Sequence, residues 1–463
     1  MVNKINGDAI RALAPTGVLG SGFLESSFKE GLRREPHFIG SDAGSTDPGP
    51  SPLGAGTTSF PPRAMKRDLR LMLLGAREAE VPLLIGTCGT AGGDPHLQIV
   101  FELLQEIARE EGLRFRTALI HAEQDKEVLK DKLRAGRIKP LNPAPEFDED
   151  TIERATRIVG MMGAEPYVAA LEGGADVVLA GRSSDTAIFA SIPTHVGFPE
   201  GLAWHAAKIL ECGAAAATHR KHPDCIMATI GRDDFVIEPL DMESRCTPQS
   251  IASHTLYENA DPFLLVEPGG TLDTTGSRYE ALDDRRVRVS GSEFLPSDRV
   301  TYKLEGAELL GYQTLVIAGV REPYILRQLD DWLANMQERF KPRVQELFGG
   351  AVGEDDYTIT VRVYGRDAVM GKLEPRKHGI GHEVGLLFSV TVGDQETSHA
   401  IAKTFSHFGL HYPIPEWRGL ITGFAFPITP AEVEQGPVYR FSLNHLLVPA
   451  DPMEPFRTEM LEA

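Results

Sequence analysis

A five-residue run, Gly181-Arg182-Ser183-Ser184-Asp185, places three kinds of reactive or binding side chain directly after an apolar segment. An arginine can pair bidentately with a carboxylate or a phosphoryl group, and serine hydroxyls can donate hydrogen bonds. Arg182, Ser183 and Ser184 are therefore candidate substrate-binding residues. Asp185 can orient the guanidinium or accept a proton, and it is a candidate catalytic residue. The alternative is a structural ion pair between Arg182 and Asp185 at the start of a helix.

A second run, residues 86–94, reads Gly-Thr-Cys-Gly-Thr-Ala-Gly-Gly-Asp. Its backbone N–H groups could approach an anion closely, and the helix expected after it would add a favourable dipole. Thr87, Gly89, Thr90 and Gly92 are thus candidate contacts to a substrate carboxylate or phosphate. The alternative is a tight strand-to-helix turn in which glycine only satisfies the backbone geometry.

The same run bears on cofactors and nucleophiles. It lacks the Lys-Ser/Thr pair of a P-loop, and its glycines do not have the dinucleotide spacing, so neither ATP nor NAD is expected. Cys88 lies just before the expected helix, an environment that can lower a thiol pKa and create a nucleophile. Because no base partner is identifiable, a cysteine-dependent hydrolase is an alternative function.

Two further pairs of polar residues follow apolar segments. His121 and Glu123 lie two residues apart and would point the same way on an extended chain, so they could act as acid and base or bind a divalent cation. Asp42 and Asp47 could bind substrate hydroxyls or, as hard oxygen ligands, Mg²⁺ or Mn²⁺. A solvated histidine and turn-forming aspartates are the structural alternatives. The cofactor is left open, with a divalent metal as the candidate.

Each of these polar loops follows a short apolar segment that predicts a β-strand. These segments are residues 36–40, 81–85, 115–120 and 175–180. They alternate with helical patterns at residues 25–32, 97–111 and 202–212. The alternation indicates βαβ units and a mainly parallel sheet. Because ligands bind outside the carboxyl ends of parallel strands, the four loops are predicted to converge at one edge. The Gly- and Pro-rich residues 44–62 are predicted to cover that site.

The length of 463 residues exceeds what one hydrophobic core usually organises. The predicted fold class is α/β, in three domains. Residues 1–220 form a mainly parallel-sheet domain that carries the glycine-rich loops. Residues 221–350 form a mixed, β-rich domain, and residues 351–463 form a small α+β domain.

Composition excludes several classes of partner. The 66 acidic and 47 basic residues leave a formal charge of -19, which argues against nucleic acid and requires a local basic pocket for an anionic substrate. No apolar run reaches the length of a membrane span. The four cysteines are too far apart for a CxxC pair. Residues 1–8 show no export signal, so the cytoplasm is the expected compartment.

The run from Met162 to Asp185 resembles the acyclic terpene utilisation AtuA-like family. Similar segments follow in the same order at residues 210–214, 261–262, 287–291, 311–312 and 436–445. The last of them is similar to members with an extended carboxyl-terminal region. The resemblance implies a role in the catabolism of branched acyl-CoA thioesters or small carboxylic acids. It also implies a small accessory protein as a candidate partner, since some members are encoded beside one.

Together these features predict a catabolic lyase or hydratase-isomerase that moves a proton α to the carbonyl of a small carboxylic acid or an acyl-CoA thioester. In this hypothesis Arg182 and the 86–94 loop bind the anion, and Asp185 or His121 moves the proton. The alternatives are a hydrolase that depends on a metal or on Cys88, and a subunit completed by a small partner protein. A homo-oligomer is expected.

Overall fold

The computed structural model describes residues 7–376, 379–414 and 422–462. The chain folds as two compact units, the first formed by Met1–Glu308 with Phe441–Ala463 and the second by Leu309–Arg440. The predicted boundary at residue 220 falls within the first unit, and the one at residue 350 falls within the second. Residues 1–6, on which the expected absence of an export signal largely rests, lie outside the described residues.

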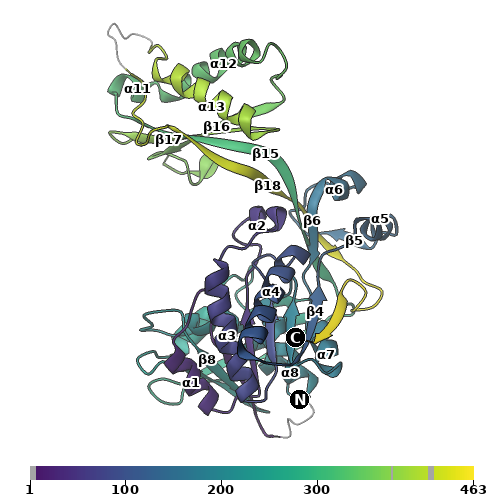
Figure 1. The fold of residues 1–463 in the computed structure, drawn as a ribbon. Coiled ribbons are helices and arrows are strands. Elements are labelled where there is room, and N and C mark those ends of the chain that lie inside the picture. The colour runs from purple at the N-terminus through teal and green to yellow at the C-terminus, as the bar shows by residue number, and fades with distance from the viewer. Residues whose placement is uncertain (1–6, 377–378, 415–421, 463) are drawn as a thin grey trace. The chain divides into compact units, whose positions relative to one another are not determined.

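A ten-stranded sheet organises the first unit (Figure 1). In spatial order its strands are β12 (Arg278–Ala281), β13 (Val287–Ser290), β9 (Asp234–Pro239), β8 (Ile226–Ile230), β1 (Ile10–Ala14), β2 (Phe38–Asp42), β3 (Leu83–Gly86), β7 (Val177–Ala180), β4 (Arg116–His121) and β19 (Arg457–Glu462). The five strands from β1 to β4 in this order are parallel to one another. β8 and β19 flank them as antiparallel neighbours. The predicted α/β fold is confirmed.

Helices cover both faces of this sheet because successive strand residues point to opposite sides. Leu83 and Ile85 pack with helices α1 (Glu25–Arg33), α3 (Pro62–Glu78) and α4 (Asp94–Glu111). Leu84 packs on the other face, whose core also draws on α7 (Glu165–Glu172), α8 (Asp185–His195), α9 (Glu200–Leu210) and α10 (Pro248–Thr255). The helices predicted at residues 25–32, 97–111 and 202–212 correspond to α1, α4 and α9.

The remaining elements of the first unit are short and lie around this core. They include a three-stranded sheet of β10 (Leu264–Glu267), β11 (Gly270–Asp273) and β14 (Glu293–Pro296). The others are α2 (Pro50–Ala55), α5 (Lys126–Arg134), β5 (Ile138–Pro140), α6 (Glu149–Arg154), β6 (Ala155–Gly160) and η2 (Gly213–Ala216). The first residues of β15 (Tyr302–Val320) pair with β6, and the last residues of β18 (Glu432–Leu447) pair with β5.

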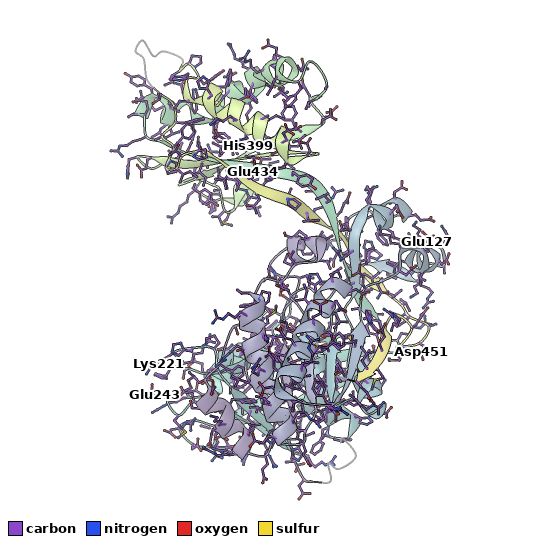
Figure 2. All side chains as sticks on the ribbon, viewed as in Figure 1. Glu127, Lys221, Glu243, His399, Glu434 and Asp451 are labelled. Atoms are coloured by element: carbon purple, nitrogen blue, oxygen red, sulfur yellow. The ribbon has the colours of Figure 1, made fainter. Side chains whose placement is uncertain are left out.

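The second unit has its own hydrophobic core, which packs on β-strands of a second sheet. β17 (Val384–Val392) pairs with β16 (Tyr357–Tyr364) and with the later residues of β15. Its helices are α11 (Pro323–Arg327), α12 (Leu329–Leu347) and α13 (Gln395–Leu410), with η3 (Gly371–Leu373) as a short turn. Trp332, Phe388 and Phe405 are fully buried in this core. His399 pairs with Glu434 at 3.0 Å, and both are labelled in Figure 2. Within the described residues, no helix combines the length and the apolarity needed to cross a membrane.

Candidate active site

The loops after β2, β3, β7 and β4 lie at one edge because these four strands are parallel neighbours. Hydrogen bonds join three of the loops directly. The N–H of Thr90 donates to the carbonyl of Ala43, and the N–H of Arg182 donates to the carbonyl of Gly92, each at 3.0 Å. The predicted convergence of polar loops at the carboxyl edge of the sheet is therefore found.

A cavity of about 530 Å³ opens beside these loops, and we call it the acidic cavity. Of the residues proposed from the sequence, Asp42, Asp47, Thr90 and Asp185 line it. The region predicted to cover the site also contributes, through Gly44, Ser45, Pro48, Ser59 and Phe60. The rest of the lining is Gly17, Val18, Ser21, Glu211, Cys212, Ala215, Arg220, Pro223, His254, Tyr257 and Glu258.

Asp42 ends β2 and is only 4% exposed. Its Oδ2 accepts the N–H of Gly44 at 3.0 Å, whereas Oδ1 is buried and has no hydrogen-bond partner among the described residues. Burial raises the pKa of Asp42 well above the usual value, and the negative charge of Asp185 raises it further. The protonated form of Asp42 is thereby favoured, and this form can donate a proton to a bound molecule.

Asp185 is the first residue of α8, and its side chain is 31% exposed. Its Oδ1 lies 3.5 Å from Nη1 of Arg182 and has no hydrogen-bond partner among the described residues. Burial raises the pKa of Asp185 to about 6, although the Arg182 cation acts in the opposite direction. Asp185 is therefore mostly ionised at neutral pH and can accept a proton. Two carboxyl groups with unlike protonation states face one cavity, an arrangement that supplies an acid and a base.

Arg182, which was predicted to bind the substrate, instead forms hydrogen bonds within the protein. It is 6% exposed, and its Nε donates to Oε2 of Glu305 at 2.7 Å while Nη1 donates to the carbonyl of Ser183 at 2.9 Å. Burial would raise the pKa of Glu305, but Arg182 and Lys303 outweigh it and lower that pKa to about 2. Arg182 is absent from the lining of the acidic cavity. Arg182 is thus a structural residue, but its hydrogen-bonded partner is Glu305, whereas Asp185, the partner in the alternative interpretation, lies 3.5 Å away.

The neighbouring hydroxyl groups also hold the loop together instead of facing the cavity. Ser183 is fully buried, and its Oγ accepts from the Tyr167 hydroxyl at 2.9 Å. Ser184 donates to Oε2 of Glu267 at 2.6 Å. Oγ1 of Thr87 accepts the N–H of Ser183 at 3.3 Å. Burial raises the pKa of Glu267 to about 7. These contacts account for three of the four predicted substrate-binding hydroxyls, and the fourth, that of Thr90, belongs to a residue that lines the acidic cavity.

The 86–94 loop does not form the predicted anion cradle, because its backbone donors are largely used within the fold. The N–H groups of Thr87 and Cys88 donate to the carbonyls of Gly181 and Ala180, where β7 ends. The N–H of Gly92 donates to the carbonyl of Cys88. Gly89 and Gly92 have φ values of +67° and +65°, and a Cβ on Gly92 would lie 2.1 Å from the nitrogen of Arg182. The glycines therefore serve a tight turn and close packing.

Cys88 is fully buried, and its thiol lies 3.7 Å from the carbonyl of Ile85. Burial raises the pKa of the Cys88 thiol far above its usual value, which is the opposite of the shift expected from the sequence. The thiolate that a nucleophile requires is thus disfavoured. Cys88 also does not line the acidic cavity.

His121 and Glu123 both contact the start of α4, and neither lines the acidic cavity. Nδ1 of His121 lies 2.8 Å from Oδ1 of Asp94, and Oε2 of Glu123 accepts the backbone N–H of Asp94 at 2.8 Å. Glu123 also lies 3.8 Å from Nε of Arg157. The two residues are therefore linked through Asp94 at the first turn of the helix, where carboxylates are stabilised by the helix dipole.

Several residues that line the acidic cavity were missed as chemical candidates, among them Glu211, His254 and Arg220. Glu211 is 6% exposed and pairs with Lys208 at 2.5 Å, and burial raises its pKa to about 8. His254 has a buried Nε2 with no hydrogen-bond partner among the described residues, and burial lowers its pKa to about 4. Arg220 is exposed at the cavity. Of these three residues, only Glu211 lies in a segment that the sequence analysis singled out, because residues 210–214 resemble the family.

The candidate metal ligands Asp42 and Asp47 both line the acidic cavity. The described part of the chain contains no group of three or more His, Cys, Asp or Glu side chains arranged to hold a metal ion. Asp47 instead accepts a hydrogen bond from the Ser45 hydroxyl at 2.9 Å, as a turn-forming aspartate does.

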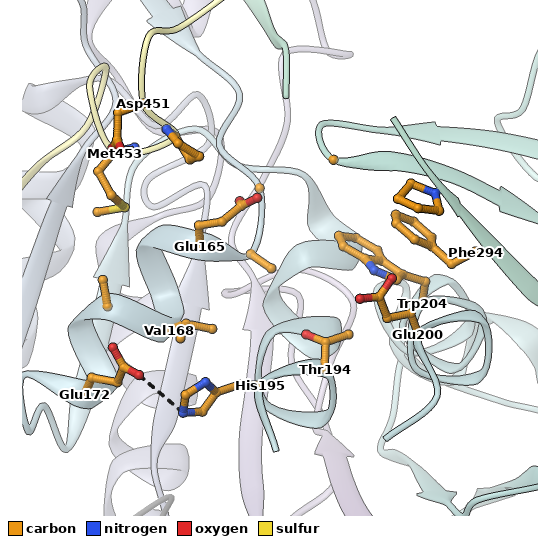
Figure 3. A pocket seen from close by; sticks show the side chains of 16 residues that line it. Glu165, Val168, Glu172, Thr194, His195, Glu200, Trp204, Phe294, Asp451 and Met453 are labelled. Carbon is orange, nitrogen blue, oxygen red and sulfur yellow. Dashed lines mark hydrogen bonds and ion pairs between the residues drawn. The ribbon is translucent and has the colours of Figure 1, made fainter. Parts of the chain in front are cut away.

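A separate cavity of about 540 Å³ lies elsewhere in the first unit (Figure 3). The rings of Trp204 and Phe294 stack in it with centroids 5.3 Å apart, and Glu172 lies 3.8 Å from His195. None of the residues proposed from the sequence lines this cavity. We therefore place the candidate active site in the acidic cavity.

The family model of the acyclic terpene utilisation family protein AtuA matches residues 89–414, which is most of the chain. The chain belongs to the AtuA family. Membership suggests a catabolic role in terpene utilisation, and it confirms the resemblance found in the sequence. Neither the curated proteins nor the solved structures contain a match to this AtuA family member.

The raised carboxyl pKa values of this AtuA family member predict a pH-dependent stability. The pKa of Asp185 is about 6 in the folded protein, against an ordinary value of 3.8, so the folded state binds the proton more tightly than the unfolded state. The stabilisation that results is complete below pH 4 and is lost as the pH rises through 6. The wild type should therefore lose free energy of unfolding between pH 4 and pH 8, and Asp185→Asn should not show this loss. We expect the difference to be on the order of 1 kcal/mol, a value reduced because the side chain is partly exposed. Thermal unfolding followed by circular dichroism at both pH values measures this. An equal pH dependence in variant and wild type would contradict it.

Proposed function

We propose that the chain is a catabolic enzyme, a lyase or hydratase-isomerase, that transfers a proton α to the carbonyl of a small carboxylic acid or an acyl-CoA thioester. One observation carries the proposal. Asp42 and Asp185 face the same cavity, each with a buried oxygen that lacks a hydrogen-bond partner, and their environments favour opposite protonation states.

In the proposed reaction the ionised Asp185 accepts the α-proton, and the protonated Asp42 donates a hydrogen bond or a proton to the carbonyl oxygen on which charge develops. This arrangement is productive because a carboxyl group kept neutral by burial can stabilise an enolate. His254 is neutral at pH 7 and offers a further uncharged partner at the cavity wall.

The walls of the cavity indicate how such a substrate would be held. Val18, Phe60 and Tyr257 provide apolar surface for an alkyl chain. Arg220 is the only lysine or arginine among the described residues that line the cavity. We assign it to the substrate carboxylate or to another anionic group at the entrance, the role that the sequence suggested for Arg182.

Exchange of α-protons with solvent tests this proposal without knowledge of the final product. The purified protein is incubated in D₂O with isovaleryl-CoA, isovalerate and related branched acids, and the α-proton signal is followed by NMR. We expect exchange with at least one member of this panel, and a loss of that exchange in Asp185→Asn. If the wild-type protein exchanges none of them above the buffer rate, proton transfer α to a carbonyl is the wrong assignment.

A further inference from the structure

A third cavity, of about 730 Å³, adjoins the acidic cavity. Ser21 and Pro223 line both cavities. Phe23, Leu24 and Pro61 give the third cavity largely apolar walls. Because the two cavities share wall residues, they are direct neighbours in the first unit.

The charge of this third cavity is opposite to that of the acidic cavity, and we call it the basic cavity. Arg63, Arg67 and His222 line it, and Arg220 lies two residues before His222 at the neighbouring entrance. The only carboxylate among its described lining residues is Asp68. In a chain with a formal charge of -19, a local concentration of arginines is the feature that an anionic ligand requires.

The charges of the basic cavity are not all cancelled by internal partners. Asp68 is buried and neutralises Arg67 at 2.8 Å, and it also accepts the N–H groups of Gly20 and Gly22. Arg63 and Arg220 are both exposed, and neither forms an ion pair or a side-chain hydrogen bond with any other described residue. Two guanidinium groups thus remain available for a ligand, and guanidinium pairs bidentately with phosphate oxygens.

We propose that the basic cavity binds the phosphate-bearing end of an extended substrate whose reacting end lies between Asp42 and Asp185. The phosphate contacts are Arg63, which lines the basic cavity, and Arg220, which lines the adjoining acidic cavity, and the apolar walls pack against the non-reacting part of the carrier. This inference rests on the proposed function for the placement of the reacting end, and it selects a thioester on a phosphate-bearing carrier over a small free acid.

Calorimetry with inorganic pyrophosphate at low salt tests the phosphate site by itself. We expect Arg63→Ala and Arg220→Ala each to weaken pyrophosphate binding about 10-fold, and the double variant about 100-fold. Arg299→Ala is the matched control, since Arg299 is exposed on the same unit and lines neither cavity. Absence of binding by the wild type, or equal binding by Arg63→Ala, overturns the proposal. So does arginine-dependent binding of succinate but not of pyrophosphate.

The link between the two cavities is tested by comparing isovaleryl-CoA with the isovaleryl thioester of N-acetylcysteamine, which lacks phosphate. In α-proton exchange, Arg63→Ala is expected to raise KM for the first about 10-fold and to leave the second unchanged. Equal effects on both overturn the assignment. Asp185→Asn should bind pyrophosphate like the wild type while exchange is lost, so a failure of the phosphate site and a failure of the proposed chemistry are distinguishable.

Discussion

Asp185→Asn is expected to lower kcat for α-proton exchange by about 10²- to 10⁴-fold, the range contributed by a positioned general base. The amide keeps the size of the carboxyl group but cannot accept the proton. KM should change little, because the substrate anion is assigned to Arg220 and not to Asp185. In the wild type, kcat/KM should rise with pH through about 6 as Asp185 ionises.

Glu123→Gln is the matched control for this experiment. Glu123 was proposed from the sequence on the same grounds as Asp185, but it contacts Asp94 and does not line the acidic cavity. We expect its kcat to stay within about 3-fold of the wild type, since the loss of a proton-transfer group costs far more. If Glu123→Gln loses as much activity as Asp185→Asn, the reaction takes place at the start of α4 and the site is misplaced.

Arg182→Ala is expected to destabilise the protein by about 3 to 5 kcal/mol, the usual cost of removing one partner from a buried ion pair. Glu305 is 4% exposed and would keep only Lys303 as a cationic partner, at 2.9 Å. Asp185 would lose the nearest positive charge. Denaturant unfolding monitored by tryptophan fluorescence and by circular dichroism measures the change in the free energy of unfolding.

Arg134→Ala provides the comparison for Arg182→Ala. Arg134 also pairs with two carboxylates, Asp131 and Glu149, but its side chain is 55% exposed. An exposed pair of this kind contributes less than about 1 kcal/mol. A loss of stability in Arg182→Ala no larger than that in Arg134→Ala would show that Arg182 is free for a ligand, as the sequence first suggested.

Much of the architecture could be predicted from local patterns. The apolar segments before Asp42, Thr87, His121 and Arg182 are the strands β2, β3, β4 and β7, and they are parallel neighbours. A β-strand with both faces covered must be apolar throughout, so the pattern is visible without any knowledge of its neighbours. The convergence of the following loops then results from strand direction alone.

The partners of each side chain could not be predicted, because they come from distant parts of the chain. Glu305, which pairs with Arg182, lies 123 residues after it in the chain. Glu267, which accepts the hydrogen bond of Ser184, lies 83 residues after that serine. Arg220 and His254 reach the acidic cavity from a segment that carried no recognisable motif. A polar residue after a strand can equally bind a ligand or satisfy a buried neighbour, and both uses have the same local sequence.

Hydrophobic periodicity depends only on nearby residues, so local sequence is enough to predict that Asp185 follows a buried strand at a polar edge. Contacts between distant parts of the chain are what place Asp185, and not Arg182, beside a cavity. The physical reason is that a buried charge must be paired, and Glu305 pairs Arg182 within the protein. Asp185 lines the acidic cavity with a side chain that is 31% exposed, and it can therefore meet a molecule bound there.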